Sequence, residues 1–237
     1  MMKNRKTKTK ISIGLSYTVL TVLSIVWLMP VAWLIMQSFR KMPTGAFPKA
    51  IIPTLWTFEN YTKLFTEIQL FNFPRWFMNT LIVAISSCIV TIILVLLTAY
   101  AFSRLRFKAH KPLMNVILVL GMFPGFMSMI AIYHILKAIG LAQSLFSLVL
   151  VYSGGAAMGY YIAKGFFDTI PVSIDEAAML DGATKNQVFW KITMPMSKPI
   201  VIYTIMTSFI APWVDFIFVS VIMKDNYQNY TIALGLF

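Results

Sequence analysis

Cysteine, histidine and acidic residues are scarce in this chain of 237 residues, and each scarcity excludes a kind of chemistry. The single cysteine, Cys88, cannot form an internal disulfide and is expected to be a small packing residue. The two histidines, His110 and His134, have no neighbouring ligands at metal-like spacing, so we expect no metal site. The chain also lacks the Gly-x-x-x-x-Gly-Lys-Ser/Thr pattern that holds nucleotide phosphates. We therefore expect no catalytic residue and no cofactor bound by this chain.

Apolar residues are abundant: they make up 59% of the chain, and the mean hydropathy is +0.76, too high for a soluble domain. Five stretches reach the length of about 20 apolar residues that crosses a hydrocarbon core. They are Ile11–Phe39, Trp76–Phe102, Leu113–Leu136, Leu145–Phe167 and Ile200–Met223. The sequence therefore predicts an all-α, multi-pass protein of the cell membrane, in contact with membrane lipid.

Clusters of basic residues predict how these spans are oriented, because cationic side chains concentrate on the cytoplasmic side. Such clusters precede the first span and follow the second: Lys3, Arg5, Lys6, Lys8 and Lys10, then Arg104, Arg106, Lys108 and Lys111. Residues 1–10 are thus a basic cytoplasmic N-terminus, and residues 11–237 form one transmembrane domain. Alternation places 40–75 outside and the loop 169–199 inside. A nucleic-acid partner is not expected, although the net charge is +12, since the charges lie in separated loops.

The loop 169–199 is a polar segment in an otherwise apolar chain, and its residues predict two short helices. Ser173 with Glu176, and Thr184 with Gln187, both have the spacing of a capping box. Between them Gly182 is the expected stop of the first helix, since glycine adopts a left-handed conformation without a Cβ clash. An apolar stripe should pack the second helix against the membrane domain: Val188, Phe189 and Ile192. Pro195 and Pro199 should separate that helix from the fifth span.

This loop resembles the signature loop of the membrane subunits of ABC importers, whose pattern is Glu-Ala-Ala, three residues, Gly, nine residues, Ile, one residue, Leu-Pro. The matching residues are Glu176, Ala177, Ala178, Gly182, Ile192, Met194 and Pro195, with Met in place of Leu. In that family the loop docks into a cleft of a separate ATPase and transmits its closure to the spans. The resemblance implies that the docking residues are Glu176, Ala177, Ala178, Met179, Leu180, Asp181, Gly182, Ala183, Ile192 and Pro195.

Four further segments resemble the carbohydrate-importing branch of this family, above all the smaller membrane subunit of maltose and maltodextrin importers. They are 76–81, 99–104, 167–171 and 213–216. The resemblance implies a type I importer fold with a sixth span, expected beyond Phe237. It also implies four partners: a homologous second membrane subunit, two ATPase subunits that bind ATP and Mg, and an extracellular sugar-binding protein.

Two groups of residues keep alternative interpretations. Glu176 could pair with a basic group of the ATPase or reach back to the Ser173 amide, and these roles can coexist. The polar segment 224–231 could contact the binding protein, or it could be an ordinary turn at a membrane interface. The residues of that tentative contact are Asn226, Tyr227, Gln228, Asn229 and Tyr230.

Asp215 is an acid within an apolar stretch, which could serve the translocation path or a structural hydrogen bond. No residue is assigned to substrate. A secondary transporter would more often show paired halves and several ion-coupling acids, and a channel would need pore-lining rings, so both are disfavoured. An ABC importer of another solute is the principal alternative.

Overall fold

The computed structural model describes residues 2–41, 51–68 and 71–237, with side chains from residue 13 onward. The basic side chains predicted to mark the N-terminus, from Lys3 to Lys10, are not among the described side chains. Helices dominate the described ranges, and the only β pairing there is an isolated bridge between Arg40 and Trp56. The chain divides into two compact units, Met1–Leu70 and Phe71–Phe237.

The first unit consists of the long helix α1 (Met2–Ser38) and the short helix α2 (Glu59–Thr66). The apolar part of α1, Ile13–Ser38, is long enough to cross a membrane, and none of its most apolar 18-residue window is buried within the chain. Such a helix is stable only where lipid or another protein covers its apolar surface.

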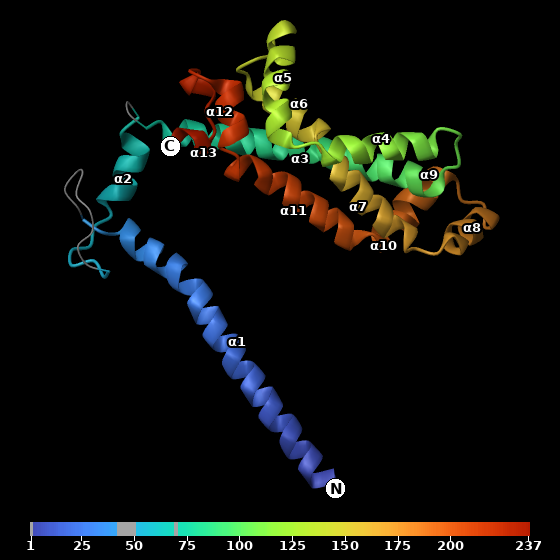
Figure 1. Ribbon diagram of the computed structural model, residues 1–237, viewed down its shortest axis with the longest axis horizontal. Helices are drawn as coiled ribbons and strands as arrows, with labels where there is room; N and C mark the ends of the chain where they lie inside the picture. The colour runs from blue at the N-terminus through green and yellow to red at the C-terminus, as the bar shows by residue number, and fades with distance from the viewer. Residues whose placement is uncertain (1, 42–50, 69–70) are drawn as a thin grey trace. The chain divides into compact units, whose positions relative to one another are not determined.

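The second unit is built around α3 (Phe73–Arg104), a helix of 32 residues and therefore about 48 Å long. Asn72 caps its first turn by accepting a hydrogen bond from the Arg75 amide. Three helices pack along α3: α6 (Leu145–Gly154), α7 (Ala157–Asp168) and α11 (Lys198–Val214) (Figure 1). Two clusters of buried apolar residues form the core, one that includes Val83 and one that includes Val95.

Three of the five predicted spans are bent pairs of helices, whereas α1 and α3 are continuous. The pair α4 (His110–Met122) and α5 (Gly125–Ala138) bends by 100°, α6 and α7 by 41°, and α11 and α12 (Ile217–Met223) by 62°. The first break falls at Pro124, because the preceding residue Phe123 takes an extended conformation that the proline ring favours. Pro124 thus interrupts the third predicted span.

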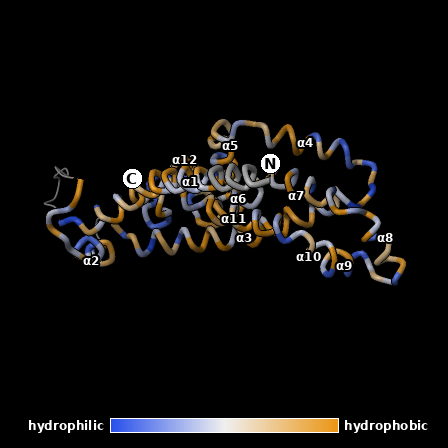
Figure 2. The backbone as a smooth tube through the Cα atoms, turned by 90° about the horizontal axis from the view of Figure 1, so that it is seen from below, coloured by the Kyte–Doolittle hydropathy of each residue, from blue (hydrophilic) through white to orange (hydrophobic). Residues whose placement is uncertain are grey.

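Short helical elements gather at the two ends of the second unit (Figure 1). One end holds α8 (Val172–Leu180), α9 (Lys185–Val188), the π-helix η1 (Phe189–Thr193) and α10 (Met194–Met196). The other holds the 3-10 helix η2 (Tyr227–Asn229) and α13 (Ile232–Gly235). Figure 2 shows hydrophilic positions around α8 and α9, whereas hydrophobic residues prevail along the long helices.

Candidate functional site

The first short helix of the predicted loop, α8, begins two residues earlier than the sequence suggested. Pro171 occupies the N-cap position, with φ −57°, and α8 has no side-chain capping hydrogen bond. The capping box predicted for Ser173 and Glu176 is therefore wrong. Pro171 has a fixed φ near the helical value and the helix runs on from Val172, so Ser173 lies in the first turn, where its hydroxyl makes no capping hydrogen bond. The Glu176 side chain is exposed rather than folded back onto a cap.

The end of α8 and the start of α9 are as predicted. Gly182 has φ +88°, the Gly182 amide bonds to the Met179 carbonyl (3.1 Å), and the Ala183 amide bonds to the Ala178 carbonyl (2.9 Å). This pair of bonds is a Schellman motif. Thr184 then forms a capping box with Gln187, through bonds of 2.8 and 3.3 Å. Residues 171–188, called here the α8–α9 corner, thus form a closed turn with both helix ends satisfied.

A buried ion pair ties this corner to the end of α3. Arg104 Nε lies 2.6 Å from Asp175 Oδ2, and the two side chains are only 6% and 5% exposed. The Arg104 guanidinium also donates to the Ile170 carbonyl at 2.8 Å. Sequence reasoning missed this pair: it used Arg104 as a marker of topology and as part of the 99–104 resemblance, and it gave Asp175 no role. The two residues are 71 positions apart, and no sequence motif contains both of them.

The second anchor is apolar and confirms the predicted stripe. Val188 and Phe189 are buried, Ile192 is half-buried, and the Phe189 ring packs edge-on against Tyr100 of α3 with centroids 4.7 Å apart. The chain then continues through the π-helix η1 and the short α10, which contains Pro195. Ser197 follows the last residue of α10, and α11 begins at Lys198. The predicted separation from the fifth span therefore falls between Pro195 and Pro199.

The tip of the corner presents apolar side chains outward. Leu180 is 89% exposed and Met179 is 40% exposed. Ala177 is exposed one turn before Leu180, so the two share a face of α8. Of the other predicted residues, Glu176, Asp181, Gly182 and Pro195 are exposed, and Ala178, Ala183 and Ile192 are half-buried. An apolar patch exposed on a rigid element is typical of an interaction surface.

At the other end of the second unit, side chains of α3 hold the 224–231 loop by its backbone. Arg75 Nε donates to the Gln228 carbonyl (2.9 Å), and Trp76 Nε1 donates to the Tyr227 carbonyl (3.2 Å). The Asn79 amide donates to the carbonyls of Gln228 (2.9 Å) and Tyr230 (3.0 Å). Four carbonyl contacts from one helix face fix the path of this loop.

The side chains of the same loop divide into inward and outward groups. The Asn226 and Asn229 amides both donate to the Gln143 carbonyl, at 3.0 and 2.8 Å. The Tyr230 hydroxyl donates to the Lys224 carbonyl at 2.6 Å, and burial raises the pKa of Tyr230, with smaller contributions from Tyr227 and Asp225. Tyr227, by contrast, is 66% exposed, and Gln228 is also exposed. Two of the five predicted contact residues, Tyr227 and Gln228, are thus exposed.

Asp215 fills the break between α11 and α12. Its carboxylate accepts hydrogen bonds from the Tyr152 hydroxyl and from the Phe218 amide, both at 3.0 Å. Of the two interpretations of this acid, the structural hydrogen bond is present. Among the described residues, no group of three or more His, Cys, Asp or Glu side chains could hold a metal ion.

Comparison with known proteins shows the family. Residues 91–236 match the family model described as the binding-protein-dependent transport system inner membrane component, and the chain belongs to this family. Its fold is that of a polytopic importer membrane subunit. A bacterial ABC transporter involved in the import of the acidic polysaccharide alginate has a similar chain, with a TM-score of 0.78, 20% identity, and coverage of 94% of this chain and 78% of that one.

More particular relatives are permeases of sugar transport systems. The chain is 32% identical to the galactooligosaccharides transport system permease protein GanQ of Bacillus subtilis, over 100% of this chain and 83% of that protein. It is 33% identical to the maltodextrin transport system permease protein MalD of Streptococcus pneumoniae, with the same coverage of both chains. The predicted resemblance to carbohydrate-importer membrane subunits is confirmed.

Proposed function

We propose that this chain is a membrane-spanning subunit of an ATP-driven importer whose solute is an oligosaccharide of the maltodextrin or galacto-oligosaccharide kind. Two relatives that carry such names align with the whole chain at 32% and 33% identity, which supports the substrate class. ATP and Mg bind to two separate ATPase subunits. A homologous second membrane subunit completes the pathway, and an extracellular sugar-binding protein delivers the solute to the 224–231 loop.

The observation that supports the coupling role is the structure of the α8–α9 corner. Its tip is apolar and exposed, and the charged residue that anchors it is buried. Leu180 is 89% exposed, while Asp175, five residues earlier, is held against Arg104 with both side chains almost fully buried. Docking of the tip into the ATPase would bury apolar surface, and closure of the ATPase would then pull the corner. Because the corner is internally closed and attached to α3 at Arg104 and Tyr100, that movement reaches the spans.

The test is the substitution Leu180→Asp in the complete importer, with Met196→Asp as a matched control. Met196 is also an exposed apolar residue, at 44%, on the same end of the second unit. Leu180→Asp should insert normally, because its side chain packs little within the chain, yet it should lose most of the co-purifying ATPase and of ATP-dependent sugar uptake. Met196→Asp should keep both. Full ATPase retention in Leu180→Asp would contradict the docking role, and uptake of a solute other than an oligosaccharide would contradict the substrate class.

A further inference from the structure

A cavity opens beside the connection between α3 and α4, at the same end of the second unit as α8. Its volume is about 600 Å³, within the range of roughly 300–1,000 Å³ that small-molecule sites span. Basic side chains of the connection line it: Arg106, Lys108, His110 and Lys111. Arg106, Lys108 and Lys111 were predicted only to mark the orientation of the spans. A walled cavity is more than orientation requires, since basic residues scattered in any short loop satisfy the same rule.

The positive charge of this cavity is not neutralised by the acids around it. Asp175 is committed to Arg104. Asp168 is committed to Lys164 at 2.6 Å and accepts a further bond from the Ser103 hydroxyl at 2.7 Å. Within the described part of the chain no ion pair involves Arg106, Lys108 or Lys111. Three exposed cations therefore surround one hollow without a counter-charge.

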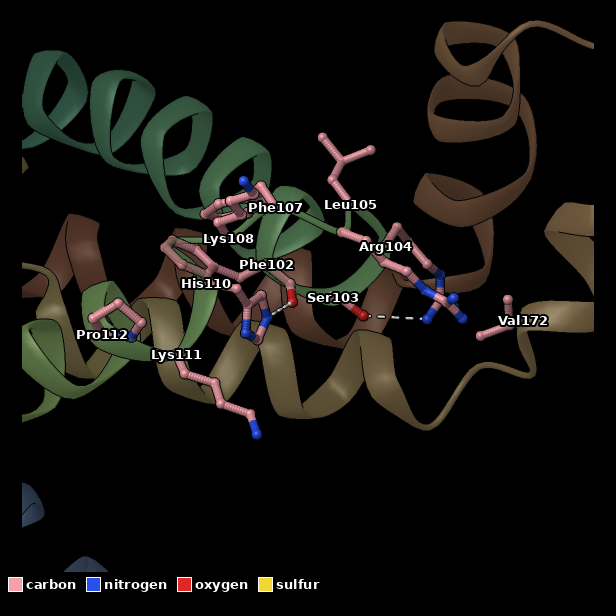
Figure 3. A pocket seen from close by; sticks show the side chains of 11 residues that line it. Phe102, Ser103, Arg104, Leu105, Phe107, Lys108, His110, Lys111, Pro112 and Val172 are labelled. Atoms are coloured by element: carbon pink, nitrogen blue, oxygen red, sulfur yellow. Dashed lines mark hydrogen bonds between the residues drawn. The ribbon is translucent and has the colours of Figure 1, made fainter.

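The wall of the cavity is pre-formed by rings. Phe102, Phe107 and His110 pack mutually with centroid distances of 5.4, 5.5 and 5.6 Å, and His110 Nε2 donates to the Phe102 carbonyl at 2.5 Å (Figure 3). In the same view Arg104 turns away from these rings toward Ser103 and Val172. The basic loop is therefore held in one shape, which lowers the entropic cost of binding an anion there.

An apolar stripe leads away from the cavity along α4. Leu113, Val116 and Leu120 are exposed and are spaced at i, i+3 and i+7, so they share one face of the helix. A ligand with an anionic head and an apolar tail matches the cavity and the stripe together, whereas a free phosphate would use only the cavity. Basic clusters beside a membrane span are the usual partners of anionic lipid headgroups.

We propose that this cavity binds the phosphate headgroup of an anionic phospholipid, with the acyl chains lying along α4. Arg106, Lys108 and Lys111 supply the charge that attracts the phosphate. The ring wall of Phe102, Phe107 and His110 positions these cations. The site lies next to the Arg104 anchor of the α8–α9 corner and is distinct from the corner's exposed tip.

The experiment measures phosphatidylglycerol retained by the intact importer after reconstitution in mixed phosphatidylglycerol and phosphatidylcholine vesicles, by native mass spectrometry. Replacing the three cations together, Arg106→Gln, Lys108→Gln and Lys111→Gln, should weaken retention about a hundredfold, since the roughly fivefold contributions of three basic residues multiply. A charge-matched control replaces three lysines elsewhere at the same end of the second unit, Lys185→Gln, Lys191→Gln and Lys198→Gln, and should retain phosphatidylglycerol as the unmodified protein does. The charge-preserving triple variant, Arg106→Lys, Lys108→Arg and Lys111→Arg, should also retain it.

Three results would overturn the proposal. They are equal retention by the neutralised variant, an equal loss in the lysine control, and complete displacement of phosphatidylglycerol by inorganic phosphate, which would make the cavity a site for soluble anions. If the triple neutralised variant fails to insert, the single variants Lys108→Gln and Lys111→Gln decide the matter, since each should lose retention about fivefold.

Discussion

The two ends of the second unit differ in what fixes their structure. At one end the α8–α9 corner closes its own helix termini through Gly182 and Thr184, and it is attached to α3 by the Arg104–Asp175 pair and by the contact of Phe189 with Tyr100. At the other end the 224–231 loop has little regular structure of its own, and α3 holds it through hydrogen bonds to its backbone.

This difference fits the coupling role proposed for the α8–α9 corner and the binding-protein contact proposed for the 224–231 loop. An element that is rigid inside and attached at few points moves as one piece and transmits force to what it is attached to. A loop whose carbonyls are bonded along its length keeps a fixed shape and presents the same surface, here Tyr227 and Gln228, to whatever approaches. The comparison therefore predicts that changes in the corner alter coupling, whereas changes in the loop alter its local order.

The largest effect is expected from Asp175→Asn. Removing one partner of a buried ion pair leaves the other charge uncompensated, which costs roughly 3–5 kcal/mol. Chemical unfolding of the purified protein in detergent should show this loss, and the ratio of uptake to ATP hydrolysis should fall because the corner is released from α3.

The matched control is Asp168→Asn, which breaks the pair with Lys164. That pair is partly exposed, at 21% and 44%, so its loss should cost no more than about 1 kcal/mol. The double variant Arg104→Met and Asp175→Leu should recover much of the stability, since no buried charge remains. An unchanged free energy of unfolding in Asp175→Asn would refute the anchor.

Gly182→Val should have the next largest effect. The residue has φ +88° and open space around its Cβ position, so the cost is purely one of backbone strain, about 1–2 kcal/mol. Uncoupled ATP hydrolysis, measured in vesicles, is the expected result. Gly165→Val serves as the control, because Gly165 also has open space but lies within α7 and has no positive φ. Equal coupling in the two variants would show that the turn is not needed.

A smaller loss of stability is expected when the start of α9 is changed, and none when the start of α8 is changed. Thr184→Ala removes the hydroxyl that accepts a hydrogen bond from the Gln187 amide, which typically costs about 1 kcal/mol of stability. Ser173→Ala removes no capping hydrogen bond and should leave the stability unchanged. Thermal unfolding of both variants measures the difference. Equal destabilisation by the two substitutions would show that Ser173 does cap α8, as the sequence predicted.

An effect of similar size, but the most local one, is expected in the loop, from Tyr230→Phe. It removes a hydrogen bond to the Lys224 carbonyl and should cost about 0.5–1.5 kcal/mol, seen as faster amide exchange confined to residues 224–231. The hydroxyl must stay protonated to donate, and its pKa is raised above 10.0 in the fold. Its contribution is therefore complete below pH 10.0 and disappears as the pH rises through the raised value. Exchange that is equally slow in both proteins at neutral pH would contradict the assignment.

Local chemistry explains which parts of this architecture the sequence could predict. The positions of the two continuous spans, the stop at Gly182 and the cap at Thr184 all depend on residues within a few positions of one another, and all of them were predicted correctly. The other three predicted spans are bent pairs of helices. The start of α8 was misjudged although it too is local, because Pro171 competes with Ser173 for the cap and the outcome depends on backbone geometry.

The contacts that assemble the site were not predictable in the same way. Arg104 and Asp175 meet only because α3 and α8 end at the same place, and a single sequence contains no signal for pairing across 71 positions. The bend of 62° after Val214 was likewise missed. At this bend Asp215 accepts bonds from Tyr152, on another helix, and from Phe218, and the first of these contacts joins residues far apart in the sequence.

The most direct test of the coupling role is the accessibility of Leu180 in the assembled importer. Leu180→Cys in a Cys88→Ser background carries a single thiol at the tip of the corner, and its rate of labelling by a water-soluble maleimide can be measured with and without the ATPase subunits. The account predicts rapid labelling of the membrane subunits alone and at least about tenfold slower labelling once the ATPase is bound. Equal rates in the two states would show that nothing docks on the tip, and the role proposed for the α8–α9 corner would be wrong.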